Sequence, residues 1–251
     1  MIRFFVDEIK NDVTVLDEEN ANHAIKSLRV KLGEKLILCD KYATEHVCIV
    51  NKIEQSHVYL TILEKKVCDS ELPTKITLYQ ALPKGDKMDS IVQKAVELGV
   101  YKIVPVLTNR CISRPDQKSI IKKIDRWQKI ALEAAKQSGR GIIPKVMPLL
   151  ELNDIEKDLD KYDCNLIFYE GGGKRIEELL PHAPIQKMSI FIGPEGGFEE
   201  YEVNFLEEHG SKTATLGKRI LRAETAPIAA LSIITYLLEE RTNLNVVPRK
   251  Y

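Results

Sequence analysis

Two segments near the end of this 251-residue chain restrict its fold more than any other feature. Residues 189–198 read Ser-Ile-Phe-Ile-Gly-Pro-Glu-Gly-Gly-Phe, and residues 213–227 pass through Leu216-Gly217 to Pro227. Each begins with a short apolar run, breaks at a glycine-bearing turn and resumes with helical spacing. Such units build open α/β sheets, whose ligands collect at the carboxyl ends of the strands. Two of these turns so close in sequence predict one shared site.

From Lys75 onward, short apolar runs alternate with stretches of helical periodicity. This alternation predicts an α/β domain with a parallel sheet covered by helices on both faces. The apolar stretch 228–238 is too short to cross a bilayer, so we expect it to be buried against the sheet or a partner subunit. The predicted strands are 75–82, 101–106, 165–169, 189–192 and 212–216, and the predicted helices are 88–98, 119–138, 175–180, 198–209 and 225–240.

The first 70 residues have a different pattern, with short alternating strands and one helix. A run of this kind predicts a small β-barrel. Residues 69–73 form the predicted linker, which divides the chain into domains 1–70 and 71–251. The predicted strands are 2–6, 35–40, 45–53 and 57–64, and the predicted helix is 20–30.

The glycines of 193–197 permit positive φ and close approach of a ligand to the backbone. A glycine loop that opens a helix usually indicates phosphate binding. Here Glu195, Glu199 and Glu200 crowd the turn, and their charge favours a neutral or cationic ligand over phosphate. An ordinary glycine turn is the alternative.

The second turn carries two apolar side chains, Ile220 and Leu221, where a loop is usually polar. They either serve packing alone or line a slot for a flat ring. Thr225 is the predicted N-cap of the final helix, and Pro227 suits its first turn.

Gly-Pro-Glu-Gly-Gly at 193–197 and Leu-Gly-Lys-Arg-Ile-Leu-Arg-Ala-Glu-Thr-Ala at 216–226 resemble the two signature motifs of the 16S ribosomal RNA (uridine-N3)-methyltransferases. This family belongs to the SPOUT superfamily, and further similarity lies at 82–88, 93–100, 133–140 and 3–5. The resemblance implies a C-terminal SPOUT domain with a deep trefoil knot, whose loops bind S-adenosylmethionine. It also implies a PUA-like RNA-binding domain at the N-terminus, a homodimer, and 16S rRNA, within the 30S subunit, as the substrate. A catalytically silent RNA-binding assembly factor on the same scaffold is the alternative.

The resemblance also implies a set of cofactor-binding residues at strand ends and in the two turns. Glu170 follows an apolar strand, where its carboxylate could accept hydrogen bonds from ribose hydroxyls. The full set is Leu82, Glu170, Gly193, Pro194, Gly196, Leu216, Ile220, Leu221 and Thr225.

Methylation of uridine N3 requires loss of an imide proton and stabilisation of the resulting anion. Arg222 and Arg140 are the cationic candidates. Glu224 or Glu133 could accept the proton or orient an arginine. Alternatively, the Glu224 carboxylate accepts hydrogen bonds from backbone amides at the start of a helix. Glu133 could instead form an ion pair with Lys129 or Lys136 on a helix surface.

The net charge is zero, but its distribution along the chain is uneven. Residues 71–145 hold 15 Lys/Arg and 7 Asp/Glu, a net of +8, whereas residues 146–251 hold 12 and 18, a net of −6. A basic block suits contact with phosphates, although lysine-rich helix surfaces are common. Trp127 is expected in the core and not on a base-stacking surface. The candidate RNA contacts are Arg3, Arg29, Lys31, Lys84, Lys87, Arg110 and Arg114.

Gly171-Gly-Gly-Lys-Arg175 suggests a phosphate-binding loop, but it lacks the Ser or Thr that must follow the lysine of a P-loop. The five cysteines form no Cys-x-x-Cys pair, so no metal site is expected. The N-terminus shows no signal peptide, which favours a cytoplasmic protein.

Overall fold

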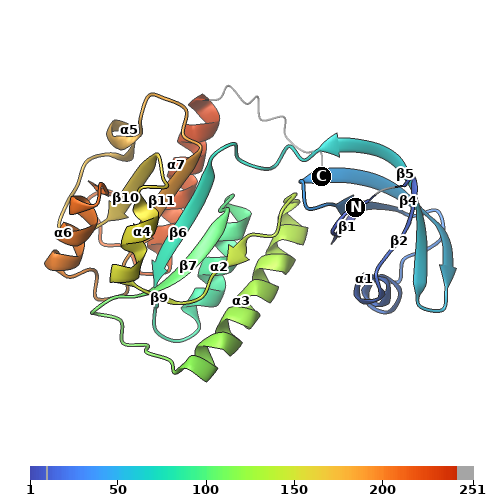
Figure 1. The fold of residues 1–251 in the computed structure, drawn as a ribbon, viewed down its shortest axis with the longest axis horizontal. Coiled ribbons are helices and arrows are strands. Elements are labelled where there is room, and N and C mark those ends of the chain that lie inside the picture. The colour runs from blue at the N-terminus through green and yellow to red at the C-terminus, as the bar shows by residue number, and fades with distance from the viewer. Residues whose placement is uncertain (10, 242–251) are drawn as a thin grey trace. The chain divides into compact units, whose positions relative to one another are not determined.

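A computed structural model describes residues 1–9 and 11–241, so the last ten residues of the predicted second domain lie outside it. The chain divides into two compact units (Figure 1). The first unit is Met1–Glu71 with Ala135–Ile143, and the second is Leu72–Ala134 with the chain from Pro144 onward. None of the described helices is both long and apolar enough to span a membrane.

The first unit is built on a five-stranded sheet in the order β1-β3-β4-β5-β2. Strands β1 and β3 are parallel, and the other pairs are antiparallel. The strands are β1 (Ile2–Phe5), β2 (Val13–Val15), β3 (Lys35–Cys39), β4 (Thr44–Glu54) and β5 (His57–Val67). Four of them match the predicted strands closely, and the three-residue β2 was not predicted.

The helix predicted over 20–30 is shorter and begins earlier. Helix α1 (Glu18–Asn22) follows Asp17, whose Oδ1 accepts a hydrogen bond from the Asn20 amide at 2.8 Å. It continues as one π-helical stretch, His23–Ser27, and ends before Arg29, which has a φ of 52°. A left-handed residue cannot continue a right-handed helix, which is why the helix stops short of Val30.

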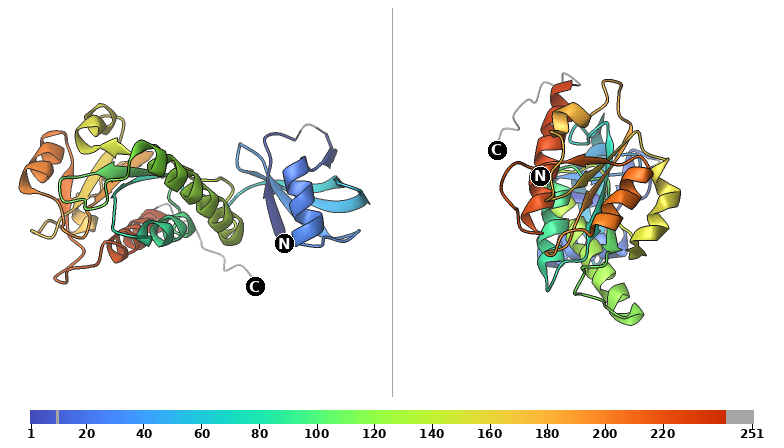
Figure 2. Two further views of the ribbon diagram at one scale, coloured as in Figure 1. Left: turned by 90° about the horizontal axis from the view of Figure 1, so that it is seen from below. Right: turned by 90° about the vertical axis from the view of Figure 1, so that its left-hand side faces the viewer.

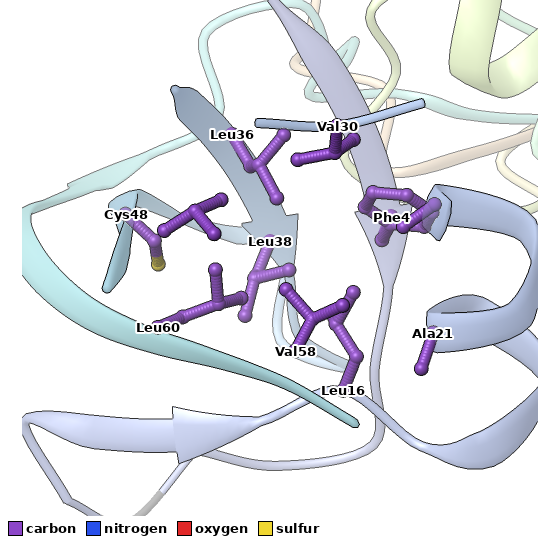
Figure 3. Close-up of a cluster of buried hydrophobic side chains, with 11 residues drawn as sticks. Phe4, Leu16, Ala21, Val30, Leu36, Leu38, Cys48, Val58 and Leu60 are labelled. Carbon is purple, nitrogen blue, oxygen red and sulfur yellow. The ribbon is translucent and has the colours of Figure 1, made fainter. Parts of the chain in front are cut away.

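An apolar cluster forms the core of the first unit (Figure 3). Phe4, Leu36 and Leu38 come from β1 and β3, and Val58 and Leu60 come from β5. Ala21 of α1 contributes a small side chain, which lets the helix pack closely over the strands. At the start of β5 the buried Val58 and Leu60 alternate with the partly exposed Tyr59 and Thr61, which fixes the face that this part of the strand turns inward.

The second unit contains a sheet in the order β12-β10-β11-β6-β7-β8, and every pair in it is parallel. The predicted parallel sheet is therefore confirmed. Short β9 (Leu150–Glu151) also pairs with β7. The strands are β6 (Lys75–Ala81), β7 (Lys102–Leu107), β8 (Lys145–Val146), β10 (Cys164–Phe168), β11 (Lys187–Ile192) and β12 (Lys212–Ala214).

Helices cover both faces of this sheet (Figure 2). Helices α2 (Lys87–Glu97) and α7 (Thr225–Arg241) lie together on one face. Helices α4 (Glu156–Leu159) and α6 (Glu200–Glu208) cover the other, where they pack with Tyr79, Ile167 and Phe191. The remaining helical elements are α3 (Gln117–Ser138), α5 (Ile176–Leu179) and a 3-10 turn at Leu152–Ile155.

Trp127 of α3 is 3% exposed and donates a hydrogen bond from Nε1 to Asp89 of α2 at 3.1 Å. Its predicted place in the core is confirmed. Helix α7 buries Pro227, Ala230 and Ile234, but it also exposes Ile233 and Tyr236. The apolar stretch 228–238 is therefore only partly covered by its own unit.

Candidate methyl-donor pocket

The first turn leaves β11 at Ile192 and enters α6 at Glu200. It closes with a hydrogen bond from the Gly197 amide to the Pro194 carbonyl at 3.0 Å. Gly197 has a φ of 70°, a conformation that favours glycine. Phe198 is 2% exposed, and this buried ring anchors the turn to the core below it.

The second turn leaves β12 at Ala214 and reaches α7 at Thr225. The Thr215 hydroxyl accepts a hydrogen bond from the Gly217 amide at 3.1 Å. Further along, the Arg222 carbonyl accepts bonds from the amides of Thr225 and Ala226 at 2.8 and 2.9 Å. Between these two fixed ends Ile220 is 87% exposed, so its side chain does not serve packing within its own unit.

Both turns line one pocket of about 280 Å³, as their spacing in the sequence predicts. The strand order explains why. Strand β10 lies between β11 and β12, so the turn that follows each outer strand flanks the end of β10. Parallel strands end at the same edge of a sheet, which places Glu170 between the two turns.

Most of the predicted cofactor residues lie on the pocket wall. Those that line it are Glu170, Gly193, Pro194, Gly196, Leu216, Ile220 and Leu221. Leu82 does not, because it is buried after β6 with its amide bonded to the Val106 carbonyl at 3.0 Å. Thr225 does not line it either, and it is the first residue of α7. The pocket is also lined by residues outside the predicted cofactor set, most of which adjoin the predicted positions: Phe168, Tyr169, Ile192, Glu195, Gly197, Ala214, Thr215, Gly217, Lys218, Arg219, Ala223 and Ala226.

The Glu170 carboxylate lies directly against the backbone of Gly197. A Cβ atom added at Gly197 would fall 1.9 Å from Oε1 of Glu170. Glycine at 197 therefore does two things: it adopts the positive φ, and it leaves room for the carboxylate on the pocket wall.

The acids of the first turn are largely compensated, which corrects the expectation that their charge alone would repel phosphate. Glu195 accepts hydrogen bonds from the Lys84 amide at 3.1 Å and from Lys87 Nζ at 2.8 Å. Glu199 accepts a bond from Arg110 Nη2 at 2.7 Å. The Arg110 guanidinium holds the pKa of the Glu199 carboxyl below its usual value.

Lys87 joins the two turns through their carboxylates. Its Nζ lies 2.8 Å from Glu195 in the first turn and 3.2 Å from Glu224 beside the second. Burial alone would raise the pKa of the Glu195 carboxyl, but the bonds from Lys87 and the backbone amides hold it below its usual value. At Glu224 a bond from its own amide lowers the pKa most, with Lys87 and Arg222 adding to the effect. We call Lys87, Glu195 and Glu224 the clamp.

The four catalytic candidates differ in their surroundings. Arg222 is exposed and sits between Leu221 and Ala223, which both line the pocket. Glu224 belongs to the clamp. Glu133 lies exposed on α3 and is not a pocket residue.

Arg140 requires a correction, because its guanidinium is occupied within the first unit. It is 2% exposed, and its Nε and Nη2 donate to Glu71 at 2.8 and 2.6 Å. The same Glu71 accepts a bond from the Gly141 amide at 2.8 Å. This ion pair fixes the chain where α3 ends, so we withdraw Arg140 as a catalytic candidate.

Arg3 requires the same correction as an RNA contact. It is 7% exposed and donates to Glu45 at 2.7 Å and to the Arg140 carbonyl at 3.2 Å. A buried guanidinium with these partners has no surface for a phosphate. By contrast, Arg29 and Lys31 are exposed in the same unit.

The basic candidates near the pocket mostly hold the turns in place. Arg110 Nη1 donates to the Gly196 carbonyl at 2.7 Å, in addition to its bond with Glu199. Arg114 donates to the carbonyls of Thr108 and Asn109 at 3.0 and 3.2 Å. Lys84 is exposed and contributes its amide to Glu195, whereas Lys87 contributes its side chain.

Comparison with known proteins gives matches over nearly the whole chain. The profile for an RNA methyltransferase domain matches residues 70–235, and the profile for an RNA methyltransferase PUA domain matches residues 16–63. The ribosomal RNA small subunit methyltransferase E of Bacillus subtilis (strain 168) is 34% identical over 250 residues, covering 95% of this chain and 98% of the relative. The protein of the same name from Mesomycoplasma hyopneumoniae (strain 232) is 35% identical over 235 residues, covering 92% and 98%.

Solved structures agree with these matches. The ribosomal RNA small subunit methyltransferase E from Neisseria gonorrhoeae bound to S-adenosyl methionine is 35% identical to this chain. The two structures superpose with a TM-score of 0.83, covering 94% of this chain and 98% of the other.

Proposed function

Because this chain belongs to the RNA methyltransferase family, with relatives named ribosomal RNA small subunit methyltransferase E, we propose that it methylates N3 of a uridine in 16S ribosomal RNA. S-adenosylmethionine is the methyl donor, as it is the ligand bound in the similar Neisseria gonorrhoeae structure. The single observation that carries the proposal is that both glycine turns line one pocket. A catalytically silent assembly factor would have no need of that pocket.

The residues of the pocket suit this cofactor. Glu170 offers a carboxylate for ribose hydroxyls, and the glycines of the first turn bring backbone amides and carbonyls to the wall. Leu216, Ile220 and Leu221 offer apolar surface for the adenine ring. The cofactor supplies an electrophilic methyl group on a positively charged sulfur.

The chain's own task is to orient the uridine and stabilise its N3 anion. Arg222 is the candidate for the second task, because it is exposed directly beside two pocket residues. Glu224 is ionised at neutral pH, since its pKa lies below the usual carboxyl value. A carboxylate with a lowered pKa is a weak base, so we assign Glu224 to orienting Arg222 and Lys87 and not to accepting the proton.

The proposed function also implies an architecture for the two units. We propose that the first unit is a PUA-like barrel that binds RNA and that the second unit contains a SPOUT trefoil knot. The limit between the two domains lies near residue 70.

We also propose that the protein is a homodimer. The exposed Ile233 and Tyr236 of α7 support a partner subunit that covers them. An enzyme that acts on 30S subunits works in the cytoplasm.

The decisive experiment measures methylated nucleosides in ribosomal RNA by mass spectrometry. Naked 16S rRNA and 30S subunits from cells that lack this protein are each incubated with the protein and S-adenosylmethionine. We expect 3-methyluridine to appear in one of the two substrates and to be absent with the Arg222→Ala variant. Cofactor binding by the wild-type protein without any methylated uridine would favour the silent assembly factor.

A further inference from the structure

Two loops bring exposed cations to the rim of the pocket. The second turn supplies Lys218 and Arg219, which are exposed and line the pocket. The glycine-rich loop that follows Glu170 supplies Lys174 and Arg175, which are also exposed. Together these four side chains form what we call the basic rim. None of them belongs to the basic block 71–145 that the charge distribution indicates.

The two loops are held side by side by backbone hydrogen bonds. The Lys174 amide donates to the Thr213 carbonyl at 3.0 Å, and the Thr215 amide donates to the Lys174 carbonyl at 3.0 Å. Lys174 therefore forms a parallel bridge with Ala214 at the end of β12. Because Thr215 begins the second turn, the cations of both loops lie at the carboxyl end of β12.

Gly173, the last of the three consecutive glycines, has a structural role in this loop. It has a φ of 151°, and an added Cβ would lie 2.8 Å from the Thr213 carbonyl oxygen. Glycine at 173 thus lets the loop backbone lie close to β12. This close contact explains the glycine without a bound phosphate. This close approach fixes the backbone of Lys174 and Arg175 next to the pocket.

The charge of the rim contrasts with its surroundings. Residues 210–223 contain Lys212, Lys218, Arg219 and Arg222 and no acidic residue, although the chain from 146 to 251 has a net charge of −6. Among the described residues, Arg175 is the one member of the rim with an ion pair, to Glu177 at 3.2 Å. The other acid on this loop, Glu170, faces Gly197. The rim therefore carries an excess of positive charge directly beside the pocket.

We propose that the basic rim binds RNA phosphates on either side of the target nucleotide and so positions the base over the pocket. This inference rests on the proposed function and adds the location of substrate binding to it. Lysine and arginine contacts to phosphate set the register of a nucleic acid without reading its sequence. Arg110 and Lys87, which the sequence suggested for this role, are already bonded to the first turn.

The test compares the double variant Lys174→Gln/Arg175→Gln with the wild-type protein. Affinity is measured at several salt concentrations for whichever substrate the wild-type protein methylates, a 16S rRNA transcript or 30S subunits. Loss of two phosphate contacts should lower the slope of log affinity against log salt by about 1.4, at roughly 0.7 per contact on single-stranded RNA. Calorimetry with S-adenosylmethionine alone should give unchanged cofactor affinity, which also shows that the variant is folded.

Lys157→Gln/Lys161→Gln is the matched control, because both lysines are exposed and precede β10, at the opposite edge of the sheet from the pocket. This control should keep the wild-type salt slope. If the Lys174/Arg175 variant kept the wild-type salt slope and affinity, RNA binding by the basic rim would be refuted and the proposed function would stand. A wild-type protein that binds S-adenosylmethionine but methylates neither substrate would instead refute the proposed function.

Discussion

The carboxylate of Glu170 lies so close to Gly197 that a Cβ at position 197 would fall 1.9 Å from its Oε1. Gly197→Ala should therefore push the carboxylate off the pocket wall. Loss of a hydrogen bond to a charged acceptor costs about 1.5–3 kcal/mol, so the affinity for S-adenosylmethionine should fall about tenfold to a hundredfold. Calorimetry with the cofactor alone measures this loss.

Gly210→Ala separates this effect from backbone strain. Gly210 has a φ of 84°, similar to the 70° of Gly197, but an added Cβ there would have no neighbour within 4 Å. Both variants should lose similar stability because an alanine is strained at positive φ. Equal cofactor affinity in the two variants would show that Glu170 has no part in binding.

Lys87→Met tests the clamp that joins the two turns. Without the ammonium, Glu195 and Glu224 lose their shared partner, and the turns should separate. Partly exposed ion pairs contribute about 1 kcal/mol or less, so we expect the free energy of unfolding to fall by no more than this and the cofactor affinity to fall about fivefold. Lys87→Arg should retain most of the affinity.

Lys94→Met is the control for this variant, since Lys94 lies on the same helix and pairs with Glu97 at 2.8 Å. It should leave cofactor affinity unchanged. If Lys87→Met weakened RNA binding but not cofactor binding, Lys87 would be an RNA contact, as the sequence suggested, and not a positioning residue.

The pH dependence of the clamp follows from the lowered pKa of Glu195. A carboxyl whose folded pKa is depressed stabilises the folded state fully above its ordinary pKa, 4.5 for this group, and loses that contribution as the pH falls through the lower folded value. We therefore expect Glu195→Gln to be less stable than wild type at pH 7. The difference in urea midpoint should persist to about pH 5 and shrink below about pH 4. A difference that stayed constant down to pH 3 would mean that this carboxylate is not held by Lys87.

Much of this fold could be predicted because its strands end at clear signals. The apolar run of β11 stops at Gly193, and that of β6 stops before Pro83, so their limits were predicted within two residues. The segment 152–159 was missed because its two helical pieces have only four residues each. Helices this short carry little periodicity, and the equally short α5 was predicted over 175–180, one residue too long at each end.

The site was predictable only where its residues lie in the two turns. Lys87 and Glu195 are 108 positions apart, and Arg140 and Glu71 are 69 apart. Sequence spacing carries no information on such pairs, because packing of the whole fold brings them together. For this reason Arg140 and Arg3 were assigned to chemistry and RNA, although both are buried in internal ion pairs.

Arg3→Met should destabilise the first unit without any direct effect on an RNA surface. The side chains of Arg3 and Glu45 are 5% and 3% exposed, and Lys66 lies 3.4 Å from the other carboxylate oxygen of Glu45. Removing one partner of a buried ion pair costs up to about 3–5 kcal/mol when the other charge is left unpaired, and here the half-exposed Lys66 remains beside Glu45, which places the expected loss at the lower end of that range. Urea unfolding, followed by a spectroscopic signal that reports on the first unit, measures the loss in its free energy of unfolding. The double variant Arg3→Met/Glu45→Met also removes the buried Glu45 carboxylate, so it should recover much of the stability that Arg3→Met loses.

Arg29→Met is the matched control, since Arg29 is an exposed arginine in the same unit. Its substitution should change the free energy of unfolding by less than about 0.5 kcal/mol, as is usual for surface positions. RNA affinity distinguishes the two roles that Arg3 could have. At a temperature where both variants are folded, Arg3→Met should bind 16S rRNA as the wild-type protein does. A stable Arg3→Met protein with weakened RNA binding would restore Arg3 as an RNA contact and would mean that its guanidinium leaves Glu45 when RNA is present.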